Sequence, residues 1–193
     1  MWDGGGSGRR TRLKICWEYS RGGSSPPRPI KKKINMIKIH DNFLDLDDLK
    51  SFYSFCLKSP YYYGERDAPN LAPTGLITPL NPDNFWYKVF EERSREVFNT
   101  QQKIYRMYIN LFLPRELPNF HRDGPPGENT LLFYPNPYKD LNSGGETKFI
   151  VNDEIRSIPP VTNRSILFDA TLMHSASSFR DNPRFTLAIK FRD

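Results

Sequence analysis

Three residues of types that bind metals stand out in the C-terminal half of the sequence. His121 and Asp123 are separated by one residue, and His174 follows further along. Side chains at i and i+2 of an extended segment point the same way, so His121 and Asp123 are expected to face inward while Arg122 faces out. Two imidazoles and one carboxylate leave open positions on iron, which suits a keto acid and dioxygen. The pattern therefore predicts a mononuclear iron site formed by His121, Asp123 and His174.

A cation further along the chain is placed to hold an acidic co-substrate. Arg184 opens an alternating run at 184–191, which predicts a strand. A turn at 181–183 is expected to bring Arg184 beside the strand that precedes His174. A guanidinium there would bind a carboxylate through two hydrogen bonds. Lys190 lies on the same side of that strand and is the alternative cation, although its position near the strand end predicts a solvated side chain.

The sequence around these residues resembles the 2-oxoglutarate and Fe(II)-dependent dioxygenases, in their prolyl 4-hydroxylase-like branch of short bacterial and bacteriophage proteins. The resemblance covers about residues 36–193. The motifs that carry it are Arg-x-Tyr-x-Asn at 106–110, His-x-Asp at 121–123, Thr-Leu-Leu-Phe-Tyr-Pro-Asn at 130–136, Gly-Gly-Glu-Thr-x-Phe at 144–149, His174 and Arg184.

This resemblance implies a mainly β protein with supporting helices, folded as a double-stranded β-helix (jelly-roll). It implies iron, 2-oxoglutarate and dioxygen as cofactor and co-substrates, with ascorbate as an accessory reductant. Arg184 would bind the distal carboxylate of 2-oxoglutarate, and the Tyr134 hydroxyl would bind the same carboxylate. Tyr108 would point into the barrel and contact the keto acid, or serve only in the core. Many prolyl hydroxylases have Lys at the position of Arg184, and the collagen-type enzymes have Tyr where this chain has Pro118.

Three functions follow from these observations. The first is hydroxylation of a protein or peptide residue, with proline as the leading candidate by resemblance. The second is oxidation of a free amino acid, a small metabolite or a modified base. The third is a non-catalytic jelly-roll that acts as a binding or structural module. A complete ligand set with Arg184 argues against the third, because a scaffold has no need of an open metal site.

Charge and cysteine content limit the alternatives. Residues 1–35 carry nine Lys or Arg and two Asp or Glu, whereas residues 36–193 carry nineteen and twenty. The basic excess therefore belongs to the first segment, and the folded domain is not predicted to bind nucleic acid. Residues 1–35 are predicted to be a disordered tail, and Met36 is an alternative start of the native protein. Cys16 and Cys56 form no disulfide framework, and without an apolar leader or membrane span the sequence predicts a cytoplasmic protein.

Hydrophobic periodicity predicts the elements that position the site. Residues 59–80 and 114–128 are expected to be loops, and the second of these holds the first two metal ligands. Gly144 and Gly145 are expected to allow a close backbone approach. Helices are predicted at 46–58, capped by Asp45, and from Pro82 to Phe98, capped by Asn81; strands are predicted at 36–40, 104–113, 130–134, 147–151, 154–158, 165–169 and 185–191.

Overall fold

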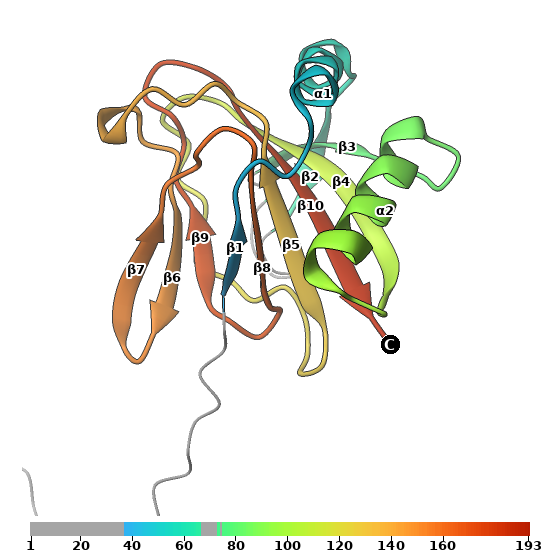
Figure 1. Cartoon of the computed structure of the whole chain (residues 1–193). Coiled ribbons are helices and arrows are strands. Elements are labelled where there is room, and N and C mark those ends of the chain that lie inside the picture. Colours follow the sequence, from blue (N-terminus) through green and yellow to red (C-terminus); the bar gives the residue numbers. More distant parts are fainter. Residues whose placement is uncertain (1–36, 67–72, 74) are drawn as a thin grey trace, which may run out of the picture. The chain divides into compact units, whose positions relative to one another are not determined.

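The computed structural model describes residues 37–66, 73 and 75–193, so the predicted tail lies outside the described residues. This part of the chain forms two α-helices, a short 3-10 helix and ten strands (Figure 1). In chain order they are β1 (Lys38–His40), α1 (Leu46–Lys58), β2 (Tyr62–Glu65), β3 (Gly75–Pro79), α2 (Phe85–Phe98), β4 (Lys103–Phe112), β5 (Asn129–Tyr134), η1 (Leu141–Ser143), β6 (Thr147–Val151), β7 (Glu154–Ile158), β8 (Arg164–Asp169), β9 (His174–Ala176) and β10 (Arg184–Arg192).

The strands form two antiparallel sheets. The larger sheet has the order β1-β8-β5-β10-β4-β3-β2, and the smaller has the order β7-β6-β9. Strand β10 is central in the larger sheet, where Ala188 lies opposite Tyr108 of β4 and Leu132 of β5. Strand β10 pairs with β4 from Arg184 to Arg192 and also with β5 from Leu187 to Phe191, and this pairing fixes its backbone position. Any side chain on its inner face is therefore held in a defined place.

Both helices cover one face of the larger sheet, away from the smaller sheet (Figure 1). Phe52 of α1 packs edge-on against Phe90 of α2 with 4.7 Å between ring centroids, and Phe90 packs on Phe133 of β5 at 5.1 Å. The next residue back, Leu132, points the opposite way and joins a second core with Phe149 of β6. Each such buried side chain contributes about 1.5–3 kcal/mol. The helices thus hold the sheet in place and leave its other face to line the interior between the sheets.

The two helices differ in how well their starts were predicted. Helix α1 begins where predicted, because the Asp45 carboxylate accepts hydrogen bonds from the backbone N–H groups of Asp47 and Asp48 at 3.0 and 2.8 Å. The predicted start of the second helix is wrong. Asn84 caps the helix, because its side chain accepts a hydrogen bond from the Trp86 N–H at 2.8 Å. Asn81 instead begins a turn, in which its carbonyl accepts a hydrogen bond from the Asn84 N–H.

Three further expectations are corrected by the topology. The segment 59–80, predicted to be a loop, contains β2 and β3, which pair with each other, and β3 also pairs with β4. Strand β9 was not predicted, and it places His174 on the smaller sheet beside β6. Arg184 does not lie beside β8, because β5 separates β10 from β8. Neither described helix is long and apolar enough to cross a membrane.

Candidate metal centre

His121 and His174 are joined directly through their backbones. The N–H of His121 donates to the His174 carbonyl at 2.9 Å, and the N–H of His174 donates to the His121 carbonyl at 3.0 Å. Such a doubly bonded antiparallel pair places both side chains on the same face, and the two imidazole centroids are 4.5 Å apart. Asp123 is fixed in the same way, because its N–H donates to the Ala170 carbonyl at 2.9 Å. The loop that carries two predicted ligands is therefore anchored to the segment that carries the third.

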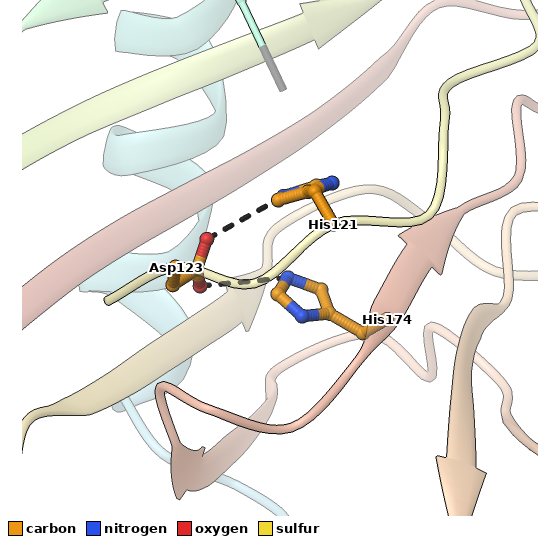
Figure 2. Close-up of side chains that lie close together, drawn as sticks. All are labelled: His121, Asp123 and His174. Atoms are coloured by element: carbon orange, nitrogen blue, oxygen red, sulfur yellow. Dashed lines mark ion pairs between the residues drawn. The ribbon is translucent and has the colours of Figure 1, made fainter. Parts of the chain in front are cut away.

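The three side chains converge, as predicted. One ligand atom from each of His121, Asp123 and His174 lies within 4.8 Å of the others (Figure 2). The Nε2 atoms of His121 and His174 each lie 3.4 Å from a different carboxylate oxygen of Asp123. The two imidazoles and the carboxylate face a common point from one side. This corresponds to the facial arrangement of ligands around non-haem iron.

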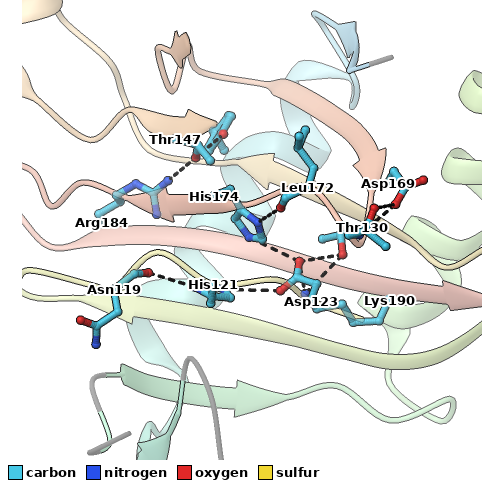
Figure 3. Close-up of polar contacts among 12 residues, drawn as sticks. Asn119, His121, Asp123, Thr130, Thr147, Asp169, Leu172, His174, Arg184 and Lys190 are labelled. Carbon is cyan, nitrogen blue, oxygen red and sulfur yellow. Dashed lines mark hydrogen bonds and ion pairs between the residues drawn. The ribbon is translucent and has the colours of Figure 1, made fainter. Parts of the chain in front are cut away.

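Backbone carbonyls orient both imidazoles. The Nδ1 atom of His121 lies 3.0 Å from the Asn119 carbonyl, and the Nδ1 atom of His174 lies 2.9 Å from the Leu172 carbonyl (Figure 3). A carbonyl accepts only, so Nδ1 carries a proton on each ring, and in the neutral form of the ring Nε2 then presents a lone pair to the centre. Two lone pairs and a carboxylate that face one another repel, and a bound cation relieves that repulsion. The donor set therefore fits a divalent metal.

Asp123 is held by two further groups that the motif did not reveal. The hydroxyl of Thr130 donates to its Oδ2 atom at 2.7 Å, and the ammonium of Lys190 forms an ion pair with the same oxygen. The Asp123 and Lys190 side chains are only 6% and 7% exposed. The place of Lys190 near the strand end had predicted a solvated side chain. Lys190 is instead buried, because β10 is covered on both edges and both faces there. This prediction was wrong.

The electrostatics of the centre favour metal binding at neutral pH. Burial alone would raise the pKa of Asp123, but Lys190, His121 and His174 together outweigh burial and hold that pKa well below its usual range. Burial lowers the pKa of His174 to about 4, because the charged imidazolium is disfavoured away from water. At pH 7 the carboxylate is therefore ionised and the His174 imidazole is neutral, which are the protonation states that ligate a metal. The contact between them is then a polar contact and not an ion pair.

Arg184 lies at another part of the same cavity. Its side chain is 1% exposed, and it donates from Nε to the Gly145 carbonyl at 2.9 Å and from Nη2 to the Thr147 hydroxyl at 3.1 Å. Gly145 has a φ of +85°, and a Cβ there would lie 2.3 Å from the Phe179 ring, so only glycine brings this carbonyl to Arg184. The predicted close backbone approach is thus observed at Gly145.

Arg184 is a buried cation without a carboxylate partner among the residues that the structure describes. Burial lowers its pKa, yet a guanidinium remains charged at neutral pH. Nearby, the Thr186 hydroxyl is buried and has no hydrogen-bond partner. Both residues line the cavity of about 320 Å³ that also contains His121, Asp123 and His174. An unpaired buried cation beside an unpaired hydroxyl fits an anionic ligand that enters this cavity.

Two predicted tyrosines lie near this ligand space in different ways. Tyr108 lines the cavity, and its ring lies 4.2 Å below the Arg106 guanidinium. Tyr134 is not among the lining residues, but its hydroxyl shares a hydrogen bond of 2.7 Å with Thr147, which also accepts from Arg184. The structure thus brings Tyr134 to the guanidinium through Thr147. The parts of Tyr108 and Tyr134 in ligand binding stay predictions.

Known proteins share this fold but not this sequence. No protein-family model and no curated protein matches the chain. Among solved structures, a Pseudomonas putida prolyl-4-hydroxylase is 13% identical with a TM-score of 0.67, covering 82% of this chain and 94% of its own. A prolyl hydroxylase from Trichoplax adhaerens, in complex with a hypoxia inducible factor peptide fragment, is 16% identical with a TM-score of 0.67, covering 82% and 84%.

A third similar structure has a different kind of bound molecule. HygX from Streptomyces hygroscopicus, with nickel, 2-oxoglutarate and hygromycin B bound, is 10% identical with a TM-score of 0.62, covering 82% of this chain and 83% of its own. At these identities the likeness shows the fold. It confirms the predicted double-stranded β-helix, and it agrees with the resemblance of the motifs to 2-oxoglutarate and Fe(II)-dependent oxygenases.

Proposed function

We propose that this chain is a 2-oxoglutarate- and Fe(II)-dependent oxygenase, and that residues 36–193 carry the activity. The observation that carries the proposal is the set of side chains that line one cavity. Three metal-binding side chains, His121, Asp123 and His174, share it with the buried and unpaired cation Arg184. A metal site alone would suit many proteins, and a buried arginine alone would suit many anions. Together they match a co-substrate that has a chelating end and an acidic end.

Each side chain has a separate part in this proposal. The Nε2 atoms of His121 and His174 and one oxygen of Asp123 would hold iron, leaving open positions on the side of the cavity. Arg184 would bind the distal carboxylate of 2-oxoglutarate bidentately, with the Thr186 hydroxyl as a further donor. Iron and 2-oxoglutarate, when bound, would allow dioxygen to hydroxylate a C–H bond, with one oxygen atom entering the product, the other entering succinate, and carbon dioxide released. The remaining walls position the substrate and limit the access of water.

The substrate that we favour is a protein or peptide residue, with proline as the leading candidate. Motifs at 121–123 and 144–149 support it by resemblance, and two of the similar structures are prolyl hydroxylases, one in complex with a peptide. The alternative is a free amino acid, a small metabolite or a modified base, and the hygromycin B complex of HygX shows that this fold also holds small molecules. Fold alone does not choose between them, because unrelated substrates share one scaffold.

The proposed function is tested by succinate formation from 2-oxoglutarate with Fe(II), ascorbate and oxygen, without added substrate. The expected result is slow turnover that is lost in His174→Ala. His40→Ala is the matched control, because His40 lies on β1 against Phe43 and Phe98 and not in the cavity. Equal turnover in the wild type and His174→Ala would contradict the proposal, as would the absence of any 2-oxoglutarate-dependent rise in melting temperature with a redox-inert metal.

A further inference from the structure

The cavity is lined by far more positive than negative side chains. Among the residues that the structure describes, five cations and two acids, Glu65 and Asp123, line it. Residues 36–193 as a whole carry nineteen basic and twenty acidic residues, so the excess of cations at this opening is local and not a property of the whole domain. The lining cations are Arg66, Arg106, Arg122, Arg184 and Lys190.

The two deepest cations are already accounted for. Lys190 is buried and forms an ion pair with Asp123, and Arg184 is buried where the distal carboxylate of 2-oxoglutarate is proposed to bind. Arg66, Arg106 and Arg122 differ from these because their side chains are partly or largely exposed. They therefore belong to the outer part of the cavity, and Glu65 is the acid that accompanies them there. Arg106 and Arg122 against Glu65 leave a net positive charge among these described residues of the outer rim.

Arg106 and Arg122 are held in place by the protein. Arg106 donates from Nη2 to Glu65 at 2.7 Å, and its guanidinium stacks 4.2 Å above the ring of Tyr108. Arg122 stands between two metal ligands in sequence, and its Nε donates to the Thr171 carbonyl at 3.0 Å. Each guanidinium has five N–H donors in a planar fork, so these contacts orient the group and leave donors directed elsewhere. Such oriented forks bind carboxylates more selectively than a mobile lysine does.

The size of the cavity limits what enters it. Its volume of about 320 Å³ is near the lower end of ligand pockets, about 300–1,000 Å³, and 2-oxoglutarate must occupy part of it. The remaining space is large enough for one side chain. A substrate of this kind would place a single residue at the metal and leave the rest of its chain over the rim. Groups that flank the reacting residue would then lie near Arg106 and Arg122.

We propose that the rim arginines Arg106 and Arg122 select a peptide segment with a carboxylate side chain next to the residue that is oxidised. This inference rests on the proposed function and names its substrate class. Opposite charges would draw the acidic segment toward the opening and fix its register, as charged clefts do for charged ligands. The neighbouring Tyr105 and Tyr108 rings would contact its apolar parts.

The test is the binding of fluorescein-labelled pentapeptides with a central proline, measured by anisotropy. The protein is loaded with Mn²⁺ and 2-oxoglutarate, and the flanking residues are Glu, Gln or Lys. We expect the Glu peptide to bind about 3- to 10-fold more tightly than the Gln peptide at low ionic strength, with the advantage shrinking as salt is added. The double variant Arg106→Gln with Arg122→Gln should bring the two peptides within about 2-fold of each other. Arg156→Gln, an exposed change on β7 outside the cavity, should keep the preference.

Other results would overturn this inference while leaving the proposed function standing. Equal affinity for the Glu and Gln peptides, including the failure of both to bind, would contradict it, as would a preference that survives in the double variant. Tighter binding of an oligothymidine than of the Glu peptide would assign the rim to nucleic acid instead. The stabilisation of the protein by Mn²⁺ with 2-oxoglutarate is recorded in the same samples. Its presence alongside any of these results separates a wrong substrate class from a wrong function.

Discussion

Replacing Lys190 by Met should destabilise the metal-free protein strongly. The substitution keeps an unbranched side chain of similar length but removes the cation that faces Asp123. Both side chains are less than one-tenth exposed, so water cannot compensate for the lost charge. Only the Thr130 hydroxyl would remain as a donor to the Oδ2 atom. Removing one partner of such a buried pair costs about 3–5 kcal/mol, because the other charge is left uncompensated.

This cost should shrink when a metal binds. A divalent ion coordinated by His121, Asp123 and His174 supplies the positive charge that Lys190 otherwise provides. For a domain of this size 1 kcal/mol corresponds to about 2–4 °C in Tm, so the metal-free variant should melt about 6–20 °C below the wild type. Saturating Mn²⁺ should raise the Tm of Lys190→Met by more than it raises that of the wild type.

Thermal unfolding of chelator-treated and Mn²⁺-loaded samples measures both effects. Lys148→Met is the matched control, because Lys148 lies on β6 outside the cavity and is not buried. A metal-free Lys190→Met protein as stable as the wild type would refute the reasoning that this ion pair is buried and needed. A smaller Mn²⁺ effect in the variant than in the wild type would refute the claim that metal and lysine neutralise the same carboxylate.

Three further predictions follow. Arg184→Leu should weaken the stabilisation by 2-oxoglutarate while Mn²⁺ still raises the Tm, as measured by thermal unfolding; unchanged 2-oxoglutarate binding would contradict this prediction. The free energy of unfolding of the metal-free protein should fall by about 3 kcal/mol as the pH falls from 6.5 to 4. The reason is that His174 stays neutral in the folded protein, with a pKa of about 4, but is protonated in the unfolded chain. Urea titrations at several pH values should show a smaller dependence on pH for His174→Asn. Asn163→Ala should cost about 2–4 kcal/mol of the free energy of unfolding in the same titrations, because Asn163 has a φ of +64° and its side chain bonds both backbone groups of Leu44; Asn163→Gly loses the same hydrogen bonds but avoids the strain that alanine has at this φ, so it should cost less.

Local signals in the sequence predicted the elements whose structure depends on near neighbours. Asp45 caps α1 through residues two and three positions away, so the start of α1 was readable. At the second helix, Asn81 was predicted to be the cap, but Asn84, three residues further on, caps the helix. Asn84 is the cap because the chain first turns at Asn81, and that choice depends on how β3 delivers the chain to the helix. Short strands such as β9, with three residues, carry too little alternation to be recognised.

The convergence of His121, Asp123 and His174 could be predicted because the proposed ligands are defined by residue type and spacing. The groups that support it depend on strand pairing that the sequence does not display. Thr130 and Lys190 meet Asp123 only because β5 and β10 pair with each other in this register. Alternation along β10 does place residue 186 on the same face as Arg184, so the Thr186 hydroxyl was within reach of sequence reasoning. The burial of Lys190 was not, since it requires knowing that β10 is a central strand.

The most direct test of the central claim is calorimetric binding of 2-oxoglutarate to the purified protein with and without Mn²⁺. The account predicts that one molecule binds only when the metal is present, that His174→Ala abolishes this binding, and that Arg184→Leu weakens it without preventing metal binding. The cavity would then join a metal and the distal carboxylate through a single ligand. Binding of 2-oxoglutarate that is equally tight without metal, or that is unchanged in both variants, would contradict the account.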